Sequence, residues 1–281
     1  MIILFLFVLK GLTVNQFGIH LYHIAYSQET LQSAPAEFLI LDNLKNERPD
    51  WFEYWPIRNF LNSSVLNEND FYGFFSPKFS LKTGLNAASV RQFVASDGGI
   101  SDCYIISPQP DMGAFYLNVF EQGEAFDNGT MATIQAAANE AGLNLLIEGL
   151  VMDSRRIVFS NYFLARPTFW RAWLNFNEII FSHAENENTE LGNLLREPTS
   201  YNDVQRKVFI QERTASLLLA TNPHWKCVRY NPFKLAWSGT PLNQFPLEAV
   251  ISDALKIAYT ETRDQEYLSA YTSVRANLQK R

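Results

Sequence analysis

Ser76, Lys78 and Lys82 are the first residues of this sequence whose type and position could do chemistry, because they follow the apolar segment 71–75. Ligands of open α/β sheets bind beyond the carboxyl ends of the strands, so residues after such a segment are expected to face a ligand. A lysine ammonium at that position can bind a phosphate or stabilise the negative charge of a departing diphosphate. Alternatively, both lysines are solvated side chains beside a surface loop.

Three acids are candidates for a general base, namely Asp111, Glu121 and Glu124. Asp111 follows the proline-containing segment 108–110, and the two glutamates share one face if a helix continues through them. A carboxylate in a cleft can accept the proton of a reacting hydroxyl, although each of the three could equally be a surface acid. If two of them faced each other across a cleft, they would form the carboxylate pair of a glycoside hydrolase. That reaction depends on the distance between the two carboxyl groups, which a sequence does not give.

Five further residues could bind a nucleoside or a sugar: Asp42, Asn43, Arg58, Asn161 and Trp170. The first two follow an apolar segment and would hold a ribose or form an Asx turn. The arginine would pair with a phosphate or with a nearby acid. The asparagine at 161 would bind a sugar hydroxyl or cap a helix, and the tryptophan would stack on a sugar ring or pack in the core.

The charge balance argues against a nucleic-acid partner, because 29 acidic residues outweigh 23 basic ones and leave a net charge of −6. A local basic pocket for one diphosphate is still compatible with that composition. Cys103 and Cys227 are the only cysteines, and both lie in apolar surroundings. We therefore predict no disulfide framework and no cysteine-rich zinc site, and a reducing cytoplasm is the simpler interpretation.

Several specific motifs are missing from the sequence, among them Gly-x-Gly-x-x-Gly, the Walker lysine motif, His-Glu-x-x-His and Gly-x-Ser-x-Gly. There is also no Asp-x-Asp pair to hold a divalent metal against a diphosphate, and the four histidines have no metal-like spacing. We therefore predict that the protein uses no metal and no other cofactor.

The N-terminal segment 1–18 is set apart by the apolar run at 2–9. This run is too short for a membrane-spanning helix, and it lacks the leading positive charges and the cleavage site of a signal peptide. We favour a buried strand or an extension over a poor signal peptide for this segment, which precedes one domain of residues 19–281. Peripheral association with a membrane is compatible with it.

Strand patterns and helix patterns alternate along most of the chain. This alternation predicts a single α/β domain with a mainly parallel sheet covered on both faces, and a helical C-terminal third. The predicted strands are 19–25, 38–42, 70–75, 104–107, 157–159 and 225–230. The predicted helices are 28–33, 51–61, 83–95, 114–120, 130–141 (with Thr130 as cap), 167–181, 203–220, 247–261 and 264 to the end.

Four stretches, in this order, resemble the bacterial capsular and lipopolysaccharide glycosyltransferases of the GT-A type, in their galactosyltransferase-like group. They are Ile19-His-Leu-Tyr-His-Ile-Ala25, the segment from Glu53-Tyr-Trp-Pro-Ile-Arg58 through Tyr72-Gly-Phe-Phe-Ser-Pro-Lys-Phe79, Phe159-Ser-Asn-Tyr-Phe-Leu-Ala-Arg-Pro-Thr-Phe-Trp170, and Glu212-Arg-Thr-Ala-Ser-Leu-Leu218. The family commonly carries His-Tyr-Arg-Arg after the strand of the second stretch. The corresponding residues of this sequence are Ser76-Pro-Lys-Phe79, which carry less positive charge.

The resemblance implies a GT-A-like, Rossmann-like domain that moves a sugar from a nucleotide-diphosphate donor to a surface-glycan acceptor, in the cytoplasm or at the inner face of the membrane. Lys78 and Lys82 would steady the diphosphate in place of a metal. Asp42, Asn43, Arg58 and Ser76 would help to bind the donor. Asp111, Glu121 or Glu124 would act as base, and Asn161 and Trp170 would bind the acceptor.

Two other classes of protein fit the same residues. One is a non-catalytic carbohydrate-binding or glycan-assembly protein that keeps the fold but has lost part of the basic motif. The other is a glycoside hydrolase that uses two of the named acids. Binding of a glycan without a nucleotide would favour the first, and a carboxylate pair across a cleft would favour the second.

Overall fold

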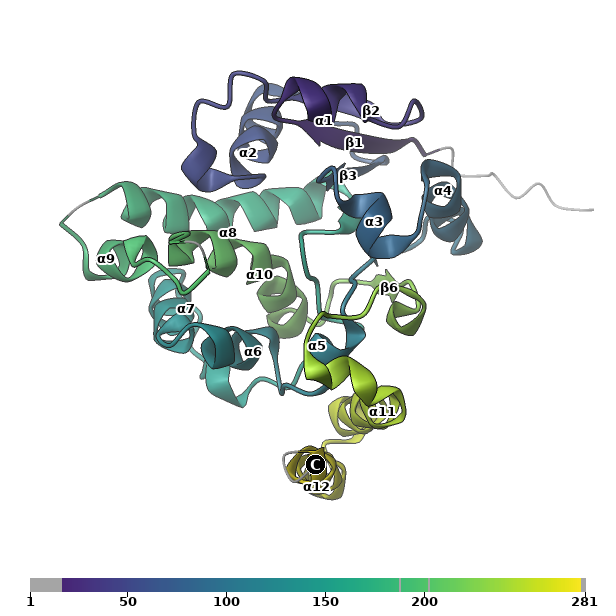
Figure 1. The fold of residues 1–281 in the computed structure, drawn as a ribbon, viewed down its shortest axis with the longest axis vertical. Coiled ribbons are helices and arrows are strands. Elements are labelled where there is room, and N and C mark those ends of the chain that lie inside the picture. The colour runs from purple at the N-terminus through teal and green to yellow at the C-terminus, as the bar shows by residue number, and fades with distance from the viewer. Residues whose placement is uncertain (1–16, 187, 202, 279–281) are drawn as a thin grey trace, which may run out of the picture.

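The computed structural model describes residues 17–186, 188–201 and 203–278, and the strands among them form one six-stranded sheet (Figure 1). The strand order is β2-β1-β3-β5-β4-β6. Strand β5 runs antiparallel to its neighbours β3 and β4, and the other pairs are parallel. The strands are β1 (Ile19–Ala25), β2 (Leu39–Asp42), β3 (Phe71–Phe75), β4 (Cys103–Ile105), β5 (Phe163–Ala165) and β6 (Cys227–Arg229).

Helices connect and cover these strands, so the protein has an α/β fold with a mixed, mostly parallel sheet. The helices with α geometry are α1 (Gln28–Gln32), α2 (Tyr54–Ser63), α3 (Phe79–Thr83), α4 (Ala87–Ser96), α5 (Pro110–Ala114), α6 (Val119–Phe126), α7 (Thr130–Glu140), α8 (Pro167–Glu185), α9 (Glu190–Arg196), α10 (Arg206–Thr221), α11 (Pro246–Thr262) and α12 (Gln265–Leu278). Four short 3₁₀ turns are η1 (Pro49–Trp51), η2 (Ile147–Gly149), η3 (Pro232–Lys234) and η4 (Pro241–Gln244).

The aromatic strand β3 lies near the middle of the sheet and is buried throughout. Its side chains alternate between two cores, as the two-residue period of a strand requires. Phe71 and Phe75 pack with α3 and α4 on one face. Tyr72 and Phe74 pack with α2, α8 and α10 on the other. Helices therefore cover both faces of the sheet.

Local chemistry explains where several helices begin. Asn118 starts α6, because its Oδ1 accepts hydrogen bonds from the backbone N–H of Phe120 and of Glu121, each at 2.9 Å. Pro167 occupies the first turn of α8, where no backbone N–H donor is needed. Pro56 lies in the first turn of α2 for the same reason, so it does not kink that helix.

Three local predictions are wrong. No helix spans residues 114–120, because α5 ends at Ala114 and the cap of Asn118 starts a separate helix. Residues 157–159 form no strand, and the short strand of this region is β5 instead. Thr130 is the first residue of α7 and not its cap, since Gly129 takes that position with a φ of 105°.

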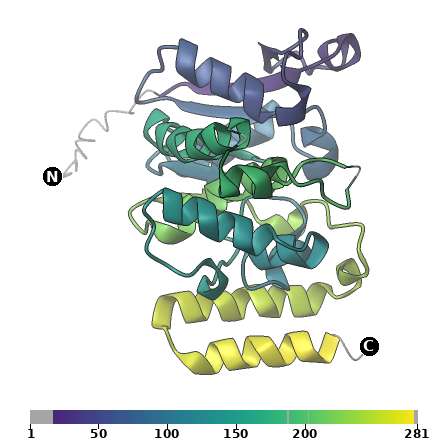
Figure 2. The same cartoon turned by 90° about the vertical axis from the view of Figure 1, so that its left-hand side faces the viewer.

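The last two helices, α11 and α12, lie side by side at one end of the molecule, as Figures 1 and 2 show. Lys256 fixes α11 to the rest of the fold, because its buried ammonium donates hydrogen bonds to the carbonyl oxygens of Gly113 (2.6 Å) and Tyr116 (2.8 Å). The structure thus confirms a helical C-terminal region following β6. The predicted N-terminal segment lies outside the described residues, apart from residues 17 and 18.

Candidate functional site

A cleft runs along the edge of the sheet where the parallel strands end. Strand β5 is antiparallel, so the residues that precede it, including Ser160, reach the same edge. Two adjoining cavities form the cleft. The one of about 470 Å³ we call the sheet chamber, and the one of about 460 Å³ we call the helix chamber. Both volumes lie in the usual range of small-molecule sites.

The sheet chamber is bounded by the segments that follow β1, β2 and β3 and by the turn that leads into α2. The helix chamber is bounded by the residues that follow β4, by α6 and the start of α7, and by the segment 199–201. Four residues line both chambers, namely Lys82, Tyr201, Phe209 and Glu212. A ligand in one chamber therefore lies next to a ligand in the other.

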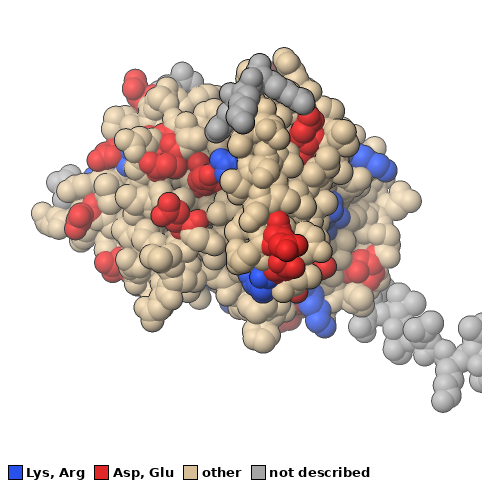
Figure 3. All heavy atoms as spheres, turned by 90° about the horizontal axis from the view of Figure 1, so that it is seen from below, with Lys and Arg blue, Asp and Glu red and all other residues tan. Residues whose placement is uncertain are grey.

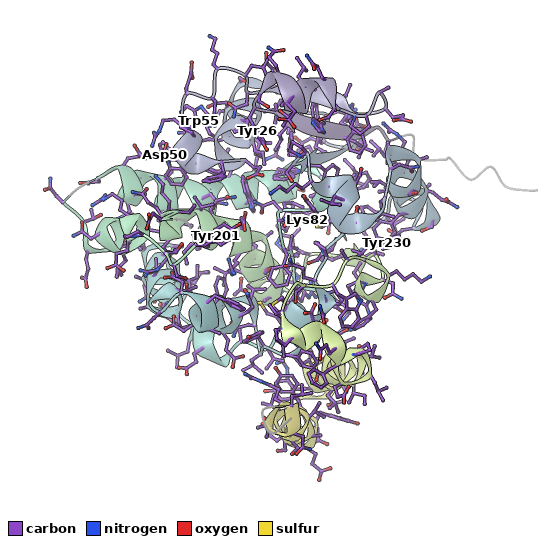
Figure 4. All side chains as sticks on the ribbon, viewed as in Figure 1. Tyr26, Asp50, Trp55, Lys82, Tyr201 and Tyr230 are labelled. Carbon is purple, nitrogen blue, oxygen red and sulfur yellow. The ribbon has the colours of Figure 1, made fainter. Side chains whose placement is uncertain are left out.

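Lys82 stands where the two chambers meet. Its Nζ donates a hydrogen bond to Ser160 Oγ at 2.9 Å and lies 5.7 Å from the centre of the Tyr162 ring. Neither Lys82 nor the exposed Lys78 forms an ion pair within 4.0 Å among the residues that the structure describes. Figure 4 places Lys82, Tyr26 and Tyr201 around the same region, on three different segments. The cleft therefore holds two positive charges that are available to an anion.

Two glutamates, Glu53 and Glu212, line the sheet chamber opposite these lysines. Burial and, second to it, the negative charge of Glu53 together raise the pKa of Glu212 to about 7. Burial also raises the pKa of Glu53, while the charges of Lys82 and Lys78 act in the opposite direction. A carboxyl whose pKa is near neutrality is suited to accept or donate a proton at physiological pH.

Two buried cations of α10, Arg213 and Lys207, fix the segments that carry these glutamates. Arg213, next to Glu212, anchors α10 by donating to the carbonyl oxygen of Val119 (3.0 Å) and to Gln122 Oε1 (2.6 Å). Lys207 donates to Asp50 Oδ2 (2.5 Å), which ties the turn before Glu53 to the same helix. Helix α10 and the entry to α2 therefore form one rigid wall of the cleft.

Backbone strain is concentrated around the cleft. Among the described non-glycine residues with positive φ, four line the chambers: Asn46 (44°), Phe52 (46°), Gln109 (60°) and Ser160 (59°). A fifth, Asn161 (53°), follows directly on Ser160. Such conformations cost about 1–3 kcal/mol each for ordinary residues and collect at functional sites. The strain supports a functional role for this cleft over other surface hollows.

Aromatic side chains are exposed mainly in the cleft. Five aromatic residues of the described chain are classed as exposed, and four of them line the two chambers: Tyr26 and Phe52 in the sheet chamber, Phe126 in the helix chamber, and Tyr201 in both. The fifth, Tyr267, belongs to α12. Exposed apolar surface that gathers in one place is typical of binding sites, and aromatic faces are suited to stacking on a base or a sugar ring.

The structure brings four of the residues singled out in the sequence together. Asn43, Ser76, Lys78 and Lys82 all line the sheet chamber. The Ser76 hydroxyl is already hydrogen-bonded to the hydroxyl of Tyr162 at 2.6 Å, whereas the ammonium of Lys78 is exposed. Lys78 is therefore the member of this group that is most accessible to a ligand.

Two other residues predicted to bind a donor do not line either chamber. Asp42 is exposed, and its Oδ1 accepts a hydrogen bond from the backbone N–H of Leu44 at 2.9 Å, as in an Asx turn. Arg58 forms an ion pair with Glu178 at 2.5 Å, and Tyr54 donates to the same carboxylate. This pairing joins α2 to α8 and uses the guanidinium.

The three acids predicted as bases also lie outside the cleft lining. Asp111 is fully buried and accepts hydrogen bonds from the backbone N–H and the hydroxyl of Ser238. Glu121 pairs with Arg275 at 2.8 Å. Glu124 accepts hydrogen bonds from backbone N–H groups at the start of α7, at 2.7–3.1 Å. Each carboxylate thus has a structural partner, and none of them faces another across the cleft lining.

The two residues predicted to bind an acceptor are both buried. Trp170 is fully buried, stacks on Phe163 with ring centres 4.4 Å apart and donates from Nε1 to the carbonyl oxygen of Tyr72 at 2.9 Å. Asn161 is 3 % exposed, and its Oδ1 has no hydrogen-bond partner among the described residues. Trp170 therefore packs in the core, while Asn161 follows a lining residue without lining the cleft itself.

The acids and aromatic residues of the cleft escape local analysis of the sequence. Glu53 and Glu212 lie within segments that carry the family resemblance, but neither follows a predicted strand. Tyr201 belongs to a polar, irregular segment that suggests only a loop. The one signal available was the order of those segments, which groups 53–58, 72–79 and 212–218 without indicating that their side chains meet.

Charged side chains elsewhere do not form a single patch on the face seen from below, where acidic groups are spread widely and basic ones are scattered (Figure 3). Among the described residues, no group of three or more His, Cys, Asp or Glu is arranged to hold a metal ion, and no helix is long and apolar enough to cross a bilayer.

No family model, curated protein or solved structure matches this chain.

Proposed function

We propose that this protein is a glycosyltransferase that moves a sugar from a nucleotide-diphosphate donor to a glycan acceptor. One observation carries the proposal: Lys78 and Lys82, which have no ion-pair partner among the described residues, share a cleft with two carboxyls of raised pKa, Glu53 and Glu212. The sheet, mostly parallel and covered on both faces, is compatible with the GT-A-like domain that the resemblance implies. A surface-glycan acceptor and a role in capsule or lipopolysaccharide synthesis rest on that resemblance.

The lysines supply the charge that a departing nucleoside diphosphate needs. Lys78 lines the sheet chamber and is exposed, and within the part of the chain that the structure describes Lys82 donates to the neutral hydroxyl of Ser160. A phosphate oxygen is a stronger acceptor than a hydroxyl, so Lys82 would gain a charge-assisted hydrogen bond when the donor binds. Both ammonium groups would then lie against the bond that breaks.

Glu212 is placed to act as the base, because it lines both chambers. The acceptor oxygen forms a bond to the anomeric carbon, and the bond from that carbon to the diphosphate oxygen breaks. The proton of the acceptor hydroxyl passes to the Glu212 carboxylate, and the diphosphate leaves with the electron pair. A pKa of about 7 leaves a useful fraction of this carboxylate ionised at neutral pH.

The exposed rings of the sheet chamber complete a donor site. Tyr26 and Phe52 line the chamber on the side of β1 and of the turn before α2. Either ring offers an apolar face on which a nucleobase can stack, while the lysines hold the diphosphate on the side of α3. Asn43 adds an amide for the ribose. The chamber is therefore suited to a whole nucleoside diphosphate.

Calorimetric titration with UDP, GDP and dTDP tests the donor site. We expect one of them to bind, and Lys78→Ala and Lys82→Met each to weaken it about tenfold or more, the loss of one charge-assisted hydrogen bond. Lys226→Ala is the matched control, because Lys226 is exposed at the opposite end of the sheet, just before β6. Absence of binding by all three nucleotides, or equal losses in the control, would contradict the proposal.

The pair formed by Glu53 and Glu212 also supports a second candidate, a glycoside hydrolase. The two carboxyls line one chamber, and the charge of Glu53 raises the pKa of Glu212. A glycoside hydrolase needs such a pair, in which one carboxyl stays protonated as the general acid and the other is ionised. Hydrolysis of nitrophenyl glycosides without any nucleotide, lost in Glu53→Gln and Glu212→Gln but retained in Lys78→Ala, would favour the hydrolase. Glycan binding with neither nucleotide binding nor hydrolysis would favour a non-catalytic binding protein.

A further inference from the structure

Apart from Lys82 and Glu212, which it shares with the sheet chamber, the helix chamber is lined by two charged residues, Asp127 and Arg213, and neighbouring groups engage both of them. Asp127 pairs with the buried Arg206 at 2.6 Å and accepts a hydrogen bond from Thr130. Arg213 is buried, and its guanidinium donates to two backbone carbonyls and to Gln122. On the wall formed by α6 and the start of α7, a charged ligand therefore finds no exposed side chain of opposite charge.

Beyond the shared Lys82 and Glu212, the polar groups that stay available in the helix chamber are neutral. Gln109 lines the chamber and makes no side-chain hydrogen bond among the described residues, and the same holds for the hydroxyl of Tyr201. An amide offers both a donor and an acceptor, and so does a hydroxyl. These groups match the hydroxyls of a sugar, each of which both donates and accepts.

Aromatic rings form the outer wall of the same chamber. Phe126 at the end of α6 is 50 % exposed, and Tyr201 is 64 % exposed. The Tyr201 ring lies edge-on to Phe209, with ring centres 6.1 Å apart. Apolar ring faces beside a few neutral polar groups are a common way to bind a pyranose, whose C–H faces stack on aromatic rings.

From these observations we propose that the helix chamber is the acceptor subsite and that it takes an uncharged sugar. Its volume of about 460 Å³ has room for about one or two pyranose rings. This inference rests on the proposed transferase function, with the nucleotide in the sheet chamber. The acceptor hydroxyl then reaches Glu212 from the side of α6, and the anomeric carbon of the donor approaches from the side of the lysines.

Two aromatic variants, one for each chamber, test the assignment. Phe126→Ala alters only the helix chamber, and Tyr26→Ala alters only the sheet chamber. Both residues are exposed, so both variants are expected to fold, which their thermal transitions will verify. The probes are UDP, measured by calorimetry, and the methyl glycosides of galactose, glucose and glucuronic acid, measured by saturation-transfer NMR.

Phe126→Ala is expected to weaken the binding of a neutral methyl glycoside at least fivefold, while the Kd for UDP stays within twofold of that of the parent protein. Tyr26→Ala is expected to do the reverse, and the anionic glucuronide to bind more weakly than the neutral glycosides. Gln109→Asn, which keeps a residue tolerant of positive φ but shortens the amide arm, is expected to weaken the neutral glycosides as well.

Two results would overturn the assignment. In the first, glycoside affinity is the same in Phe126→Ala and in the parent protein. In the second, the glucuronide binds as tightly as the neutral glycosides. If UDP binds and no glycoside does, the acceptor subsite is wrong and the donor site stands. If glycosides bind in a manner that depends on Phe126 while no nucleotide binds, the transferase function is wrong and the sugar site stands.

Discussion

Replacing Glu212 by glutamine should stabilise the protein, and more so as the pH rises. In the folded protein the pKa of Glu212 is raised from its ordinary 4.5 to about 7, first by burial and then by the charge of Glu53. The folded state therefore binds this proton more tightly than the unfolded state does. Stability contributed by the protonated carboxyl is complete below about pH 4.5 and is lost as the pH rises to about 7.

The size of the effect follows from that difference in pKa. A change from 4.5 to about 7 corresponds to at most roughly 3 kcal/mol at 1.36 kcal/mol per tenfold change in proton affinity. The side chain is partly exposed, so water screens its charge, and about 1–2 kcal/mol is the reasonable expectation. For a chain of this length that amounts to an increase of about 2–5 °C in Tm at pH 8, and to less than half of this at pH 5.

Thermal unfolding followed by circular dichroism at pH 5 and pH 8 measures the effect. Glu185→Gln is the matched control of opposite sign, because Glu185 pairs with Arg48 at 2.6 Å and its hydrogen bonds to Arg48 and Trp51 lower its pKa despite partial burial. That variant should lose stability at pH 8. If the Glu212→Gln variant shows no gain in Tm, or the same gain at the two pH values, the pKa of Glu212 is not raised in the folded protein and the reasoning is wrong.

Three further predictions follow from single contacts. Glu53→Gln should lower the pKa of Glu212, so the acidic limb of a pH–rate profile for sugar transfer should shift to lower pH. An unchanged limb would show that the charge of Glu53 does not act on Glu212. Trp170→Ala should cost about 3–5 kcal/mol in a urea denaturation experiment, because a fully buried indole is removed, and a cost under about 1 kcal/mol would contradict its place in the core. Asp127→Asn should cost about 1–3 kcal/mol in the same assay, since buried Arg206 loses one of its two charged partners, and full stability would show that Glu197 alone suffices.

Five of the six predicted strands overlap a strand of the structure, and 157–159 does not. The alternating segment 19–25 matches β1, and the predicted strand 70–75 matches β3, whose apolar residues are buried on both faces of a covered sheet. The position of Lys78 and Lys82 after β3 places them at the edge of the sheet for the same reason. The antiparallel direction of β5 has no such local signal, since a three-residue apolar run is equally compatible with a parallel and with an antiparallel strand.

The sequence by itself determined that this chain builds an α/β fold with a mostly parallel sheet, and that two lysines stand at the end of its most aromatic strand. Only the tertiary structure decided which acids share their cleft. Asp111 follows β4 but turns inward to Ser238, which is 127 residues away along the chain, whereas Glu212 reaches the cleft from α10. Strand and helix patterns arise from neighbours in the chain, but a site is made by side chains that meet only when helices pack on the sheet.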